Sequence, residues 1–446
     1  MRVKIAVIGA GISGIGAALA LADQHDVRLF EKDGRFGGHA HTNEIDYDGV
    51  PMRVDTGFIV FNTKNYPNLC ALFEHLKVPS ENSNMTFSVS TEDGALEYAC
   101  TSLKTVFAQR WRLADPRFWA VFAEILRFNR TAKAWLAASG GAGDHESLSD
   151  WLDRERFSAR FRDAFLYPMG GAIWSTPSGD IGDFPARAFI QFFVNHELLN
   201  GFRQEIVWRT VSGGSRAYVD RALQALGPRA QAGVGAVRVE RLATGQVRVR
   251  FADGSDDVFD HVVLATHSDQ ALALLAEPGA EERRLLSAVR YAPNVAVLHR
   301  DPSLMPQRRA VWSSWNFRAA RIGAAVGDGR PPAVSYWMNR LQNLDPARPL
   351  FVTLNPTVEP DPALTFARHD YAHPQFDAAA FDAQTRMDAV QGAGGVWYAG
   401  AWLGWGFHED GLSAGLRVAA ALGARPSWAV NLDDARLRPP LAIAAE

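Results

Sequence analysis

The chain is poor in cysteine, and it has neither a long uninterrupted apolar run nor an excess of positive charge. Cys70 and Cys100 are its only cysteines. Two thiols exclude a disulfide framework and a cysteine-rich zinc site, so we expect no metal and a reducing, cytoplasmic setting. No apolar run reaches the ~20 residues that a spanning helix needs. The predicted fold begins at Arg2, so we also expect no signal peptide.

Charge and length narrow the class of protein further. The formal net charge is −3 at pH 7, so no whole-protein positive field favours nucleic acid as a partner. The 446 residues exceed the ~250–300 at which a single core stops growing, and we therefore expect two domains. The sequence leaves the oligomeric state open.

The N-terminal segment carries the pattern of a dinucleotide-binding site. Residues 3–8 form a short apolar run that predicts a parallel strand buried on both faces. Gly9, Gly11 and Gly14 follow at once, and they allow a tight turn, close approach to a pyrophosphate, and close packing of the next helix. That helix, predicted over 13–22, points its N-terminal amides and its positive dipole end at the phosphates.

The next residues indicate which dinucleotide is bound. Glu31 ends a second predicted strand over 27–30, where its carboxylate would accept hydrogen bonds from both ribose hydroxyls and repel a 2′-phosphate. Gly37 and Gly38 follow soon after Arg35. A nicotinamide cofactor has no need of this second glycine pair, whereas a flavin cofactor extends onward and needs bare backbone there. The alternative is a glycine-rich turn without a ligand, but strand, glycines, helix, strand and acid all occur in register.

These motifs resemble the signature of a known superfamily. GAGISG at 9–14, the Glu31-Lys32 pair and RFGG at 35–38 are similar to the N-terminal signature of the FAD-dependent amine oxidases and phytoene desaturases. The resemblance implies an α/β fold with a Rossmann-like FAD-binding domain of the amine-oxidase type and an inserted α+β substrate domain. The superfamily usually has arginine after the glycine pair, whereas this chain has His39.

Other segments match the cofactor domain of the superfamily. Residues 43–54 predict a hairpin, and after it the resemblance brings the backbone of Thr56 and Gly57 to the flavin, with a plain β-turn as the alternative. The resemblance also implies that Val237 clamps the adenine through its backbone. Thr266 ends a buried predicted strand, and the resemblance implies that this end lies close to the pyrophosphate.

The last motif completes the predicted cofactor site. A strand predicted over 395–400 ends in Gly400, and the residues after it lead into a helix that runs to about residue 422. By resemblance, this helix points its N-terminus at the pyrimidine edge of the flavin, where its dipole stabilises negative charge by an amount on the order of 1 kcal/mol. Gly411 and Leu412 match the backbone positions involved. No cysteine lies in this region, so we expect FAD to be bound non-covalently.

The same region supplies candidate catalytic residues. Phe407 falls where amine oxidases place one tyrosine of their aromatic cage. His408 and Glu409 are candidate bases, and their alternative role is to cap the helix and hold the loop. The motifs and the resemblance together give the following cofactor contacts: Gly9, Gly11, Ser13, Gly14, Glu31, Lys32, Arg35, Gly37, Gly38, His39, Thr56, Gly57, Val237, Thr266, Gly400, Gly411 and Leu412.

Residues 101–205 have a different character. A helix predicted over 117–130 has an aromatic, apolar face and is flanked by arginines. Such a helix either lies on an anionic bilayer, with its arginines at the headgroups, or packs against the core of the substrate domain. The first alternative predicts a peripheral contact with the inner face of the membrane. The flanking arginines are Arg110, Arg112, Arg117, Arg127 and Arg130.

Several tryptophans are candidate walls of a hydrophobic substrate pocket, with core packing as the alternative. They are Trp174, Trp312, Trp315 and Trp337. Trp174 follows a helix that begins near residue 161 and that we expect to end at the glycine pair 170–171.

The strand predicted over 291–299 bears on the substrate. Flavin amine oxidases commonly place a lysine there, near the flavin, and this chain has none. The absence argues against an amine oxidase and favours a desaturase of apolar substrates. YAPNVAVLHRD at 291–301 and WSSWNF at 312–317 resemble a narrower bacterial group, the flavoproteins that accompany cyclopropane-synthase-like fatty-acid methyltransferases. That group includes the flavin enzyme of furan fatty acid biosynthesis, which implies a methylated unsaturated acyl chain as substrate.

We therefore predict an FAD-dependent oxidoreductase that desaturates an apolar, lipid-like substrate by hydride transfer to flavin N5. The predicted domains are a discontinuous FAD-binding domain of residues 1–85, 206–270 and 386–430, a substrate domain of residues 86–205 and 271–385, and a C-terminal tail of residues 431–446. Three alternatives remain: a flavin amine oxidase, an isoprenoid or carotenoid desaturase, and a flavin-binding scaffold for the methyltransferase. The sequence leaves open the electron acceptor and whether the acyl chain is free or bound in a phospholipid.

Overall fold

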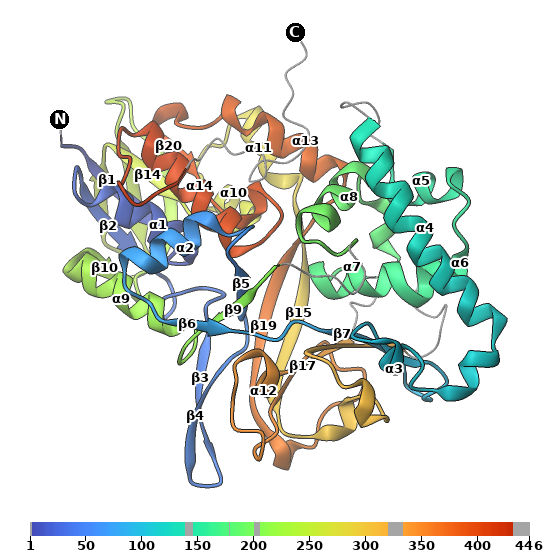
Figure 1. The fold of residues 1–446 in the computed structure, drawn as a ribbon. Coiled ribbons are helices and arrows are strands. Elements are labelled where there is room, and N and C mark those ends of the chain that lie inside the picture. The colour runs from blue at the N-terminus through green and yellow to red at the C-terminus, as the bar shows by residue number, and fades with distance from the viewer. Residues whose placement is uncertain (1, 139–145, 178, 200–205, 320–332, 431–446) are drawn as a thin grey trace.

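The computed structural model of the chain describes residues 2–138, 146–177, 179–199, 206–319 and 333–430. A five-stranded parallel sheet and a seven-stranded mixed sheet form its framework, and helices lie beside both (Figure 1). No helix in these ranges is both long enough and apolar enough to cross a membrane. The predicted tail, 431–446, lies outside the described residues.

The five-stranded sheet gathers strands from three distant parts of the chain. Its order is β10 (Ala230–Gln231), β2 (Asp26–Phe30), β1 (Lys4–Ile8), β14 (His261–Leu264) and β20 (Val396–Tyr398), and every neighbouring pair is parallel. β1 is almost wholly buried, as its apolar sequence predicts. Because the carboxyl ends of parallel strands meet at one edge, the residues that follow β1, β2, β14 and β20 come together there.

Separate hydrophobic cores cover the two faces of this sheet. One face carries α1 (Ile12–Leu21), α2 (Pro67–His75), α9 (Arg216–Leu226) and α14 (His408–Ala421). The other face carries an antiparallel sheet of β11 (Ala236–Arg241), β12 (Val247–Phe251) and β13 (Asp256–Phe259), together with α10 (Ser268–Leu274), α11 (Ala280–Ser287) and α13 (Ala378–Arg386). This double cover explains why the strands of the sheet are apolar on both sides.

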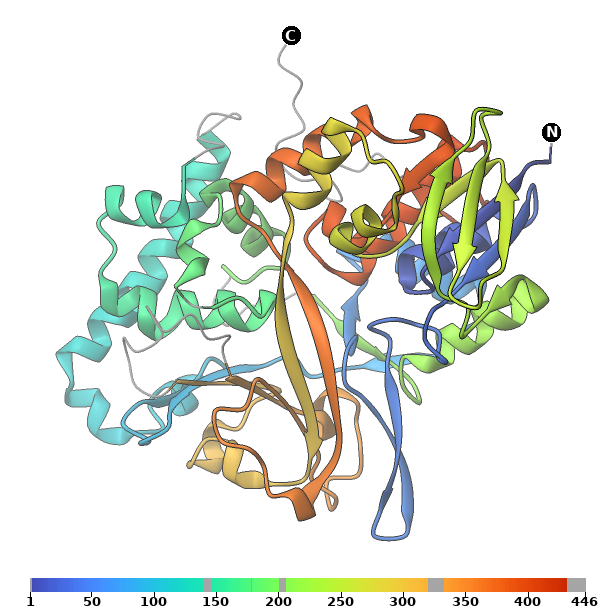
Figure 2. The ribbon, with the colours of Figure 1, turned by 180° about the vertical axis from the view of Figure 1, so that it is seen from behind.

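The seven-stranded sheet supports the other half of the molecule. Its order is β19 (Thr365–Gln375), β15 (Arg290–His299), β18 (Phe351–Leu354), β17 (Ala333–Trp337), β16 (Trp315–Ala319), β7 (Phe87–Thr91) and β8 (Glu97–Ala99). The long pair β15 and β19 rises from this sheet toward the parallel sheet (Figure 2). A group of helices lies beside it: α3 (Leu103–Val106), α4 (Pro116–Ala138), α5 (Leu148–Arg154), α6 (Ala159–Phe161), α7 (Tyr167–Trp174) and α8 (Ala186–Asn195).

Shorter elements complete the fold. β3 (Thr42–Tyr47) and β4 (Val50–Asp55) form the hairpin predicted over 43–54, with positive φ angles of 52° at Asp48 and 86° at Gly49 in its turn. The remaining elements are the sheet of β5 (Val60–Asn62), β9 (Trp208–Val211) and β6 (Ser80–Asn82), and the short helix α12 (Met338–Leu341).

One predicted helix end is wrong. α7 continues through Gly170 and Gly171 to Trp174, and the chain turns at Ser175, which has a φ of 54°. The glycines serve packing instead, since a Cβ on Gly170 would lie only 3.0 Å from the ring of Phe189. Glycine inside a helix is compatible with close contact to a neighbouring helix, although it lowers helix propensity.

Asp55 joins the hairpin to both halves of the molecule. Its buried carboxylate accepts hydrogen bonds from the Ser215 backbone N–H at 2.9 Å, from the Thr42 hydroxyl at 2.5 Å and from Gln342 Nε2 at 2.9 Å. Burial raises the pKa of Asp55 to about 6, although the bonds from Thr42 and Ser215 favour the carboxylate. Ser215 precedes α9 and Gln342 follows α12, so one side chain links distant segments.

We expect Asp55→Ala to lower the free energy of unfolding by roughly 2–5 kcal/mol, because it leaves several buried donors without an acceptor. The midpoint of urea unfolding measures the change. Asp23→Ala, at an exposed position after α1, should leave that midpoint unchanged. Equal midpoints for Asp55→Ala and the unmodified chain would contradict the structural role.

Candidate functional site

The first glycine turn connects β1 to α1 at the carboxyl edge of the parallel sheet. Gly9 has a φ of 98°, and a Cβ on Gly14 would lie 1.9 Å from the Gly9 carbonyl oxygen, so both positions require glycine. A Cβ on Gly11 would meet nothing within 4 Å. The backbone at Gly11 is therefore bare and open, as a pyrophosphate requires. Ser13 is buried in the first turn of α1.

Glu31 lies against this turn. Its carboxylate accepts hydrogen bonds from the Ala10 N–H at 2.8 Å and from the Asp33 N–H at 3.1 Å. These bonds hold the acid at the end of β2, beside the glycine turn. That is the position that the sequence predicts for a carboxylate that binds a ribose.

The second glycine pair folds back onto the first turn. Gly37 donates its N–H to the Ala10 carbonyl at 2.8 Å, and a Cβ on Gly38 would lie 3.1 Å from Gly11 Cα. Arg35 donates to the Gly38 carbonyl at 2.8 Å. Arg35 therefore fixes the loop, and the two glycines allow its close contact with the first turn; their predicted contact with a flavin cofactor remains a prediction.

Other predicted contacts lie around the same edge. Gly411 at the start of α14 faces α1, since a Cβ there would lie 2.9 Å from Ser13 Oγ. The Thr266 carbonyl accepts a hydrogen bond from Trp402 Nε1 at 3.1 Å. Gly400 lies directly beside this bond, since a Cβ on Gly400 would lie 2.3 Å from the same indole nitrogen.

Three further predicted contacts are Lys32, Val237 and Leu412. Val237 lies at a register shift in β11, so its backbone has no partner residue in the ladder with β12. A Cβ on Gly235 would lie 3.1 Å from Lys32 Cβ, so Lys32 lies close to the start of β11. The Leu412 side chain packs against α1, where a Cβ on Gly16 would lie 2.4 Å from its Cδ1, while the prediction for Leu412 concerns its backbone.

The turn after β4 packs on the segment that follows the second glycine pair. Phe58 donates its N–H to the His39 carbonyl at 2.7 Å, and Thr56 donates to the His41 carbonyl at 2.9 Å. A Cβ on Gly57 would lie 2.0 Å from the His39 carbonyl oxygen. This contact brings Thr56 and Gly57 next to His39.

His39 belongs to an aromatic cluster that the sequence analysis did not assemble. Its ring lies 5.1 Å from Tyr371, 5.4 Å from His373 and 6.2 Å from His267. Burial is the main cause that lowers the pKa of His39 well below its ordinary value. It also lowers the pKa of His373 to about 4, so both imidazoles are neutral at pH 7. The sequence signal for this cluster is the period of two in a strand, because side chains at residues 369, 371 and 373 of β19 point to the same face.

Two nitrogens of this cluster mark a place for a polar ligand. His39 Nε2 and His373 Nδ1 are buried and have no hydrogen-bond partner within the described part of the chain. Unpaired buried polar atoms are rare and costly. Together with the open backbone at Gly11 and the acid at Glu31, they fit a dinucleotide with phosphate and polyol oxygens.

The candidate bases on α14 are both held by other groups. The His408 ring stacks on Phe58 at 3.8 Å, and its Nε2 lies 3.2 Å from the Tyr218 hydroxyl. Burial lowers its pKa to about 3. Glu409 accepts the backbone N–H groups of Asn68 at 3.0 Å and Leu69 at 2.9 Å, so it caps α2. The geometry gives each residue a structural partner, and a catalytic role for either remains only a prediction.

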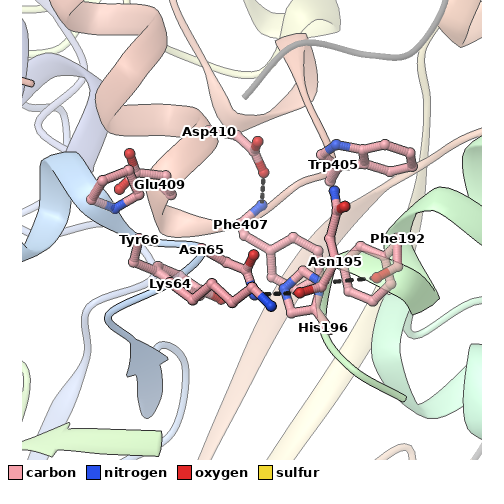
Figure 3. A pocket seen from close by; sticks show the side chains of 11 residues that line it. Lys64, Asn65, Tyr66, Phe192, Asn195, His196, Trp405, Phe407, Glu409 and Asp410 are labelled. Carbon is pink, nitrogen blue, oxygen red and sulfur yellow. Dashed lines mark hydrogen bonds between the residues drawn. The ribbon is translucent and has the colours of Figure 1, made fainter. Parts of the chain in front are cut away.

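A pocket lies at the N-terminus of α14 (Figure 3). It opens to solvent, and its space of about 440 Å³ includes the solvent at its mouth. Phe407 stacks on Phe192 at 5.2 Å, and Phe192 stacks on His196 at 3.9 Å, so one wall is aromatic. The other lining residues are Lys64, Asn65, Tyr66, Pro67, Asn195, Trp405, Glu409 and Asp410. Of these residues the sequence analysis named only Phe407 and Glu409, because the others come from segments that no local motif connects.

His196 is the residue of this pocket with an available imidazole nitrogen. Its Nδ1 lies 3.1 Å from the Phe192 carbonyl. Since a carbonyl only accepts hydrogen bonds, Nδ1 carries the proton and Nε2 keeps its lone pair. Burial lowers the pKa of His196 to about 4, with a smaller contribution from Lys64. Burial also raises the pKa of both Glu409 and Asp410 to about 7.

The four predicted tryptophans do not line this pocket. Trp174 is buried in the core of the helical layer, where it lies 4.6 Å from Phe192 and therefore directly behind the wall. Trp312 and Trp337 contact each other edge to face at 5.5 Å, and Trp315 contacts Tyr336 at 5.0 Å, all in the seven-stranded sheet and its loops. The structure does not bring the four together.

Comparison with known proteins gives a family and a set of similar folds. The family model described as flavin containing amine oxidoreductase matches residues 12–304. No curated protein matches the chain significantly. A fatty acid isomerase from P. acnes that produces CLA has a similar fold, with a TM-score of 0.66 at 17% identity over 94% of this chain and 98% of that one.

Two further solved structures have the same fold. A putrescine oxidase bound to putrescine has a TM-score of 0.68 at 16% identity, over 95% of this chain and 100% of that one. A putative protoporphyrinogen oxidase from Exiguobacterium has a TM-score of 0.66 at 14% identity, over 95% of this chain and 99% of that one. At these identities the similarity shows the fold alone.

We expect Glu31→Ala to weaken cofactor binding about 10- to 100-fold, because hydrogen bonds to a charged group contribute roughly 1.5–3 kcal/mol each. The ratio of flavin to protein absorbance in the purified protein measures the loss. Glu44→Ala, at an exposed acid on β3, is the matched control and should keep the full flavin content. An unchanged flavin ratio in Glu31→Ala would contradict the predicted ribose contact.

Proposed function

The chain belongs to the family of flavin containing amine oxidoreductases, and from this premise we propose that it desaturates a fatty acyl chain. The proposed substrate is a methylated unsaturated acyl chain, as in furan fatty acid formation. Membership of this family makes the protein a flavin-dependent oxidoreductase, with FAD as the flavin. When bound, FAD supplies an acceptor for two electrons, taken from a C–H bond as hydride. The residues of the chain must then bind the substrate, exclude water and remove a proton.

The single observation that carries the proposal is the aromatic pocket beside α14. Phe192, Trp405 and Phe407 line it with aromatic rings, and burying an acyl chain against such a surface contributes ~0.8 kcal/mol per methylene. An aromatic ring that faces an allylic carbon would stabilise positive charge that develops there, by ~0.5–2 kcal/mol. One of the similar folds is described as a fatty acid isomerase, which supports an acyl substrate.

The charged groups of the pocket do not favour an amine. The Glu409 carboxylate is engaged by two backbone N–H groups, and Asp410 accepts the Phe407 N–H at 2.8 Å. Lys64, at the pocket wall, is paired with Glu197 at 2.7 Å, so this pair offers no free carboxylate to an ammonium group. β15 has no lysine, and the last lysine of the chain is Lys133. The similarity to a putrescine oxidase keeps an amine oxidase as the second candidate.

His196 is the residue that we assign to proton removal. Its Nε2 is unprotonated, and the imidazole lies in the pocket beside Phe192 and Phe407. A proton on a carbon next to a cationic centre is strongly acidic, so a neutral imidazole with a low pKa is basic enough to take it. His408 and Glu409 lack an equivalent free position, because Tyr218 and the backbone of α2 occupy them.

The test of this function is an anaerobic titration. The purified flavoprotein is mixed with bacterial phospholipid that contains methylated unsaturated acyl chains, and with the same lipid without the methyl group. We expect the flavin absorbance to bleach only with the methylated lipid, and the recovered chain to have lost two hydrogen atoms. Bleaching by putrescine or other amines instead would establish the second candidate, and bleaching by a carotenoid precursor would establish an isoprenoid desaturase.

We expect His196→Phe to slow flavin reduction by substrate roughly 100-fold while flavin content stays constant, because a positioned base contributes about 10²–10⁴-fold. In the unmodified enzyme the pKa of His196 is lowered to about 4, so the base is neutral above that value. The rate should therefore be level at neutral pH and fall only as the pH drops through about 4. Stopped-flow rates over pH measure both effects.

His75→Phe is the matched control, since His75 is exposed at the end of α2, and it should keep the full rate. A normal rate in His196→Phe would exclude His196 as the base without excluding the desaturase function.

A further inference from the structure

Large apolar side chains are exposed together on one part of the helical layer. Trp111, Leu113, Trp119, Leu126 and Leu103 have exposed fractions of 58%, 56%, 44%, 56% and 60%. The other large apolar side chains exposed to a similar degree, among the residues that the structure describes, are single valines at distant positions. Clustered exposure of tryptophan and leucine marks an interaction surface, whereas isolated exposed side chains do not.

These side chains come from consecutive segments of the chain, and we call the surface of these segments the tryptophan face. It comprises residues 103–130, that is α3, the short turn Arg110–Ala114 and the first part of α4. Trp119 Nε1 donates to the Leu113 carbonyl at 3.0 Å, and the Trp119 ring lies 4.8 Å from Phe107. Trp119 and Leu126 are two helical turns apart and so lie on one side of α4. The face lies at the outer edge of the molecule, away from the parallel sheet (Figure 1).

The charge on this surface has one sign. Lys104, Arg110, Arg117 and Arg130 are exposed. The acids of the same segment are only partly exposed and are engaged: Asp115 pairs with Arg112 at 3.2 Å, and Glu124 accepts the Ser158 N–H at 2.9 Å. Exposed cations around tryptophan and leucine complement the headgroups and outer acyl region of an anionic bilayer.

Core packing accounts for only one side of α4. Phe118, Val121 and Phe128 are buried on its inner side, as the sequence predicts for a helix of the substrate domain. A mostly apolar pocket also lies at this inner side, with Arg112 and Arg160 among its lining residues, and its space of about 460 Å³ includes open solvent. Trp119 and Leu126 face outward and gain nothing from that core, so their exposure needs another explanation.

We propose that the tryptophan face binds the surface of an anionic phospholipid bilayer, with Trp111, Leu113, Trp119 and Leu126 at the headgroup and acyl boundary and the cations on the phosphates. The charge complementarity selects this occupant over an uncharged or cationic partner. The proposal does not depend on which substrate the enzyme oxidises. The described residues contain no membrane-spanning helix, and the tryptophan face would give the enzyme a reversible contact with a membrane.

The experiment is sedimentation of the purified flavoprotein with vesicles of phosphatidylcholine alone and of phosphatidylcholine with one-third phosphatidylglycerol. We expect binding to the anionic vesicles at least tenfold tighter than to the neutral ones, and weakened by added salt. The double variant Trp119→Ser with Leu126→Ser, and the double variant Arg110→Glu with Arg117→Glu, should each lose at least tenfold in affinity. Flavin content and thermal midpoint report that these variants fold.

Val358→Ser is the matched control, because Val358 is equally exposed at 57% but lies outside the tryptophan face. It should bind the anionic vesicles as the unmodified protein does. Equal binding to both vesicle types, no binding to either, or equal affinity of the folded variants and the unmodified protein would each overturn the proposal. If the unmodified protein self-associates and binds no vesicles, and Trp119→Ser with Leu126→Ser abolishes the self-association, the membrane proposal is overturned. The occupant of the tryptophan face would then be a second copy of the chain.

Discussion

The close crossing of α1 and α14 is the constraint on which the rest of the site depends. A Cβ on Gly415 would lie 2.2 Å from the Ser13 carbonyl oxygen, and one on Gly14 would lie 1.9 Å from that of Gly9. Only backbone fits at these points, so the two helices and the glycine turn form one rigid unit. Because α14 cannot shift relative to that turn, its N-terminus and the pocket at Phe407 are held at a fixed place relative to the dinucleotide turn.

The junction between the two sheets is polar but carries little charge. β19 brings His369, Tyr371 and His373 to the segment after the second glycine pair, and Tyr371 bonds both His41 at 3.0 Å and Thr56 at 3.1 Å. Burial lowers the pKa of the histidines there, so the junction offers neutral donors and acceptors rather than fixed positive charge. Where the superfamily usually has an arginine, His39 therefore provides hydrogen bonding without a permanent cation.

The pocket separates groups that maintain the fold from groups that are free to react. The two acids at the start of α14 accept backbone N–H groups and so help to hold the scaffold; for Glu409, one of the two candidate bases in the sequence, a catalytic role remains a prediction. His196 comes from a different segment, at the end of α8, and its own backbone contact sets the tautomer that leaves one nitrogen open. Burial lowers the pKa of this imidazole to about 4, which keeps it neutral at pH 7.

The sequence by itself determined what local geometry dictates. The strand and glycines at 3–14, the acid at Glu31, the pair Gly37-Gly38 and the hairpin at 43–54 are short-range patterns, because each requires particular backbone angles or a repeating side-chain period. Only the tertiary structure decided which distant residues meet: the histidines of β19 with His39, His196 with Phe407, and the separation of Trp174 from Trp312. These contacts join segments with no fixed spacing in the chain, so they depend on sheet order and helix packing, which local patterns do not encode.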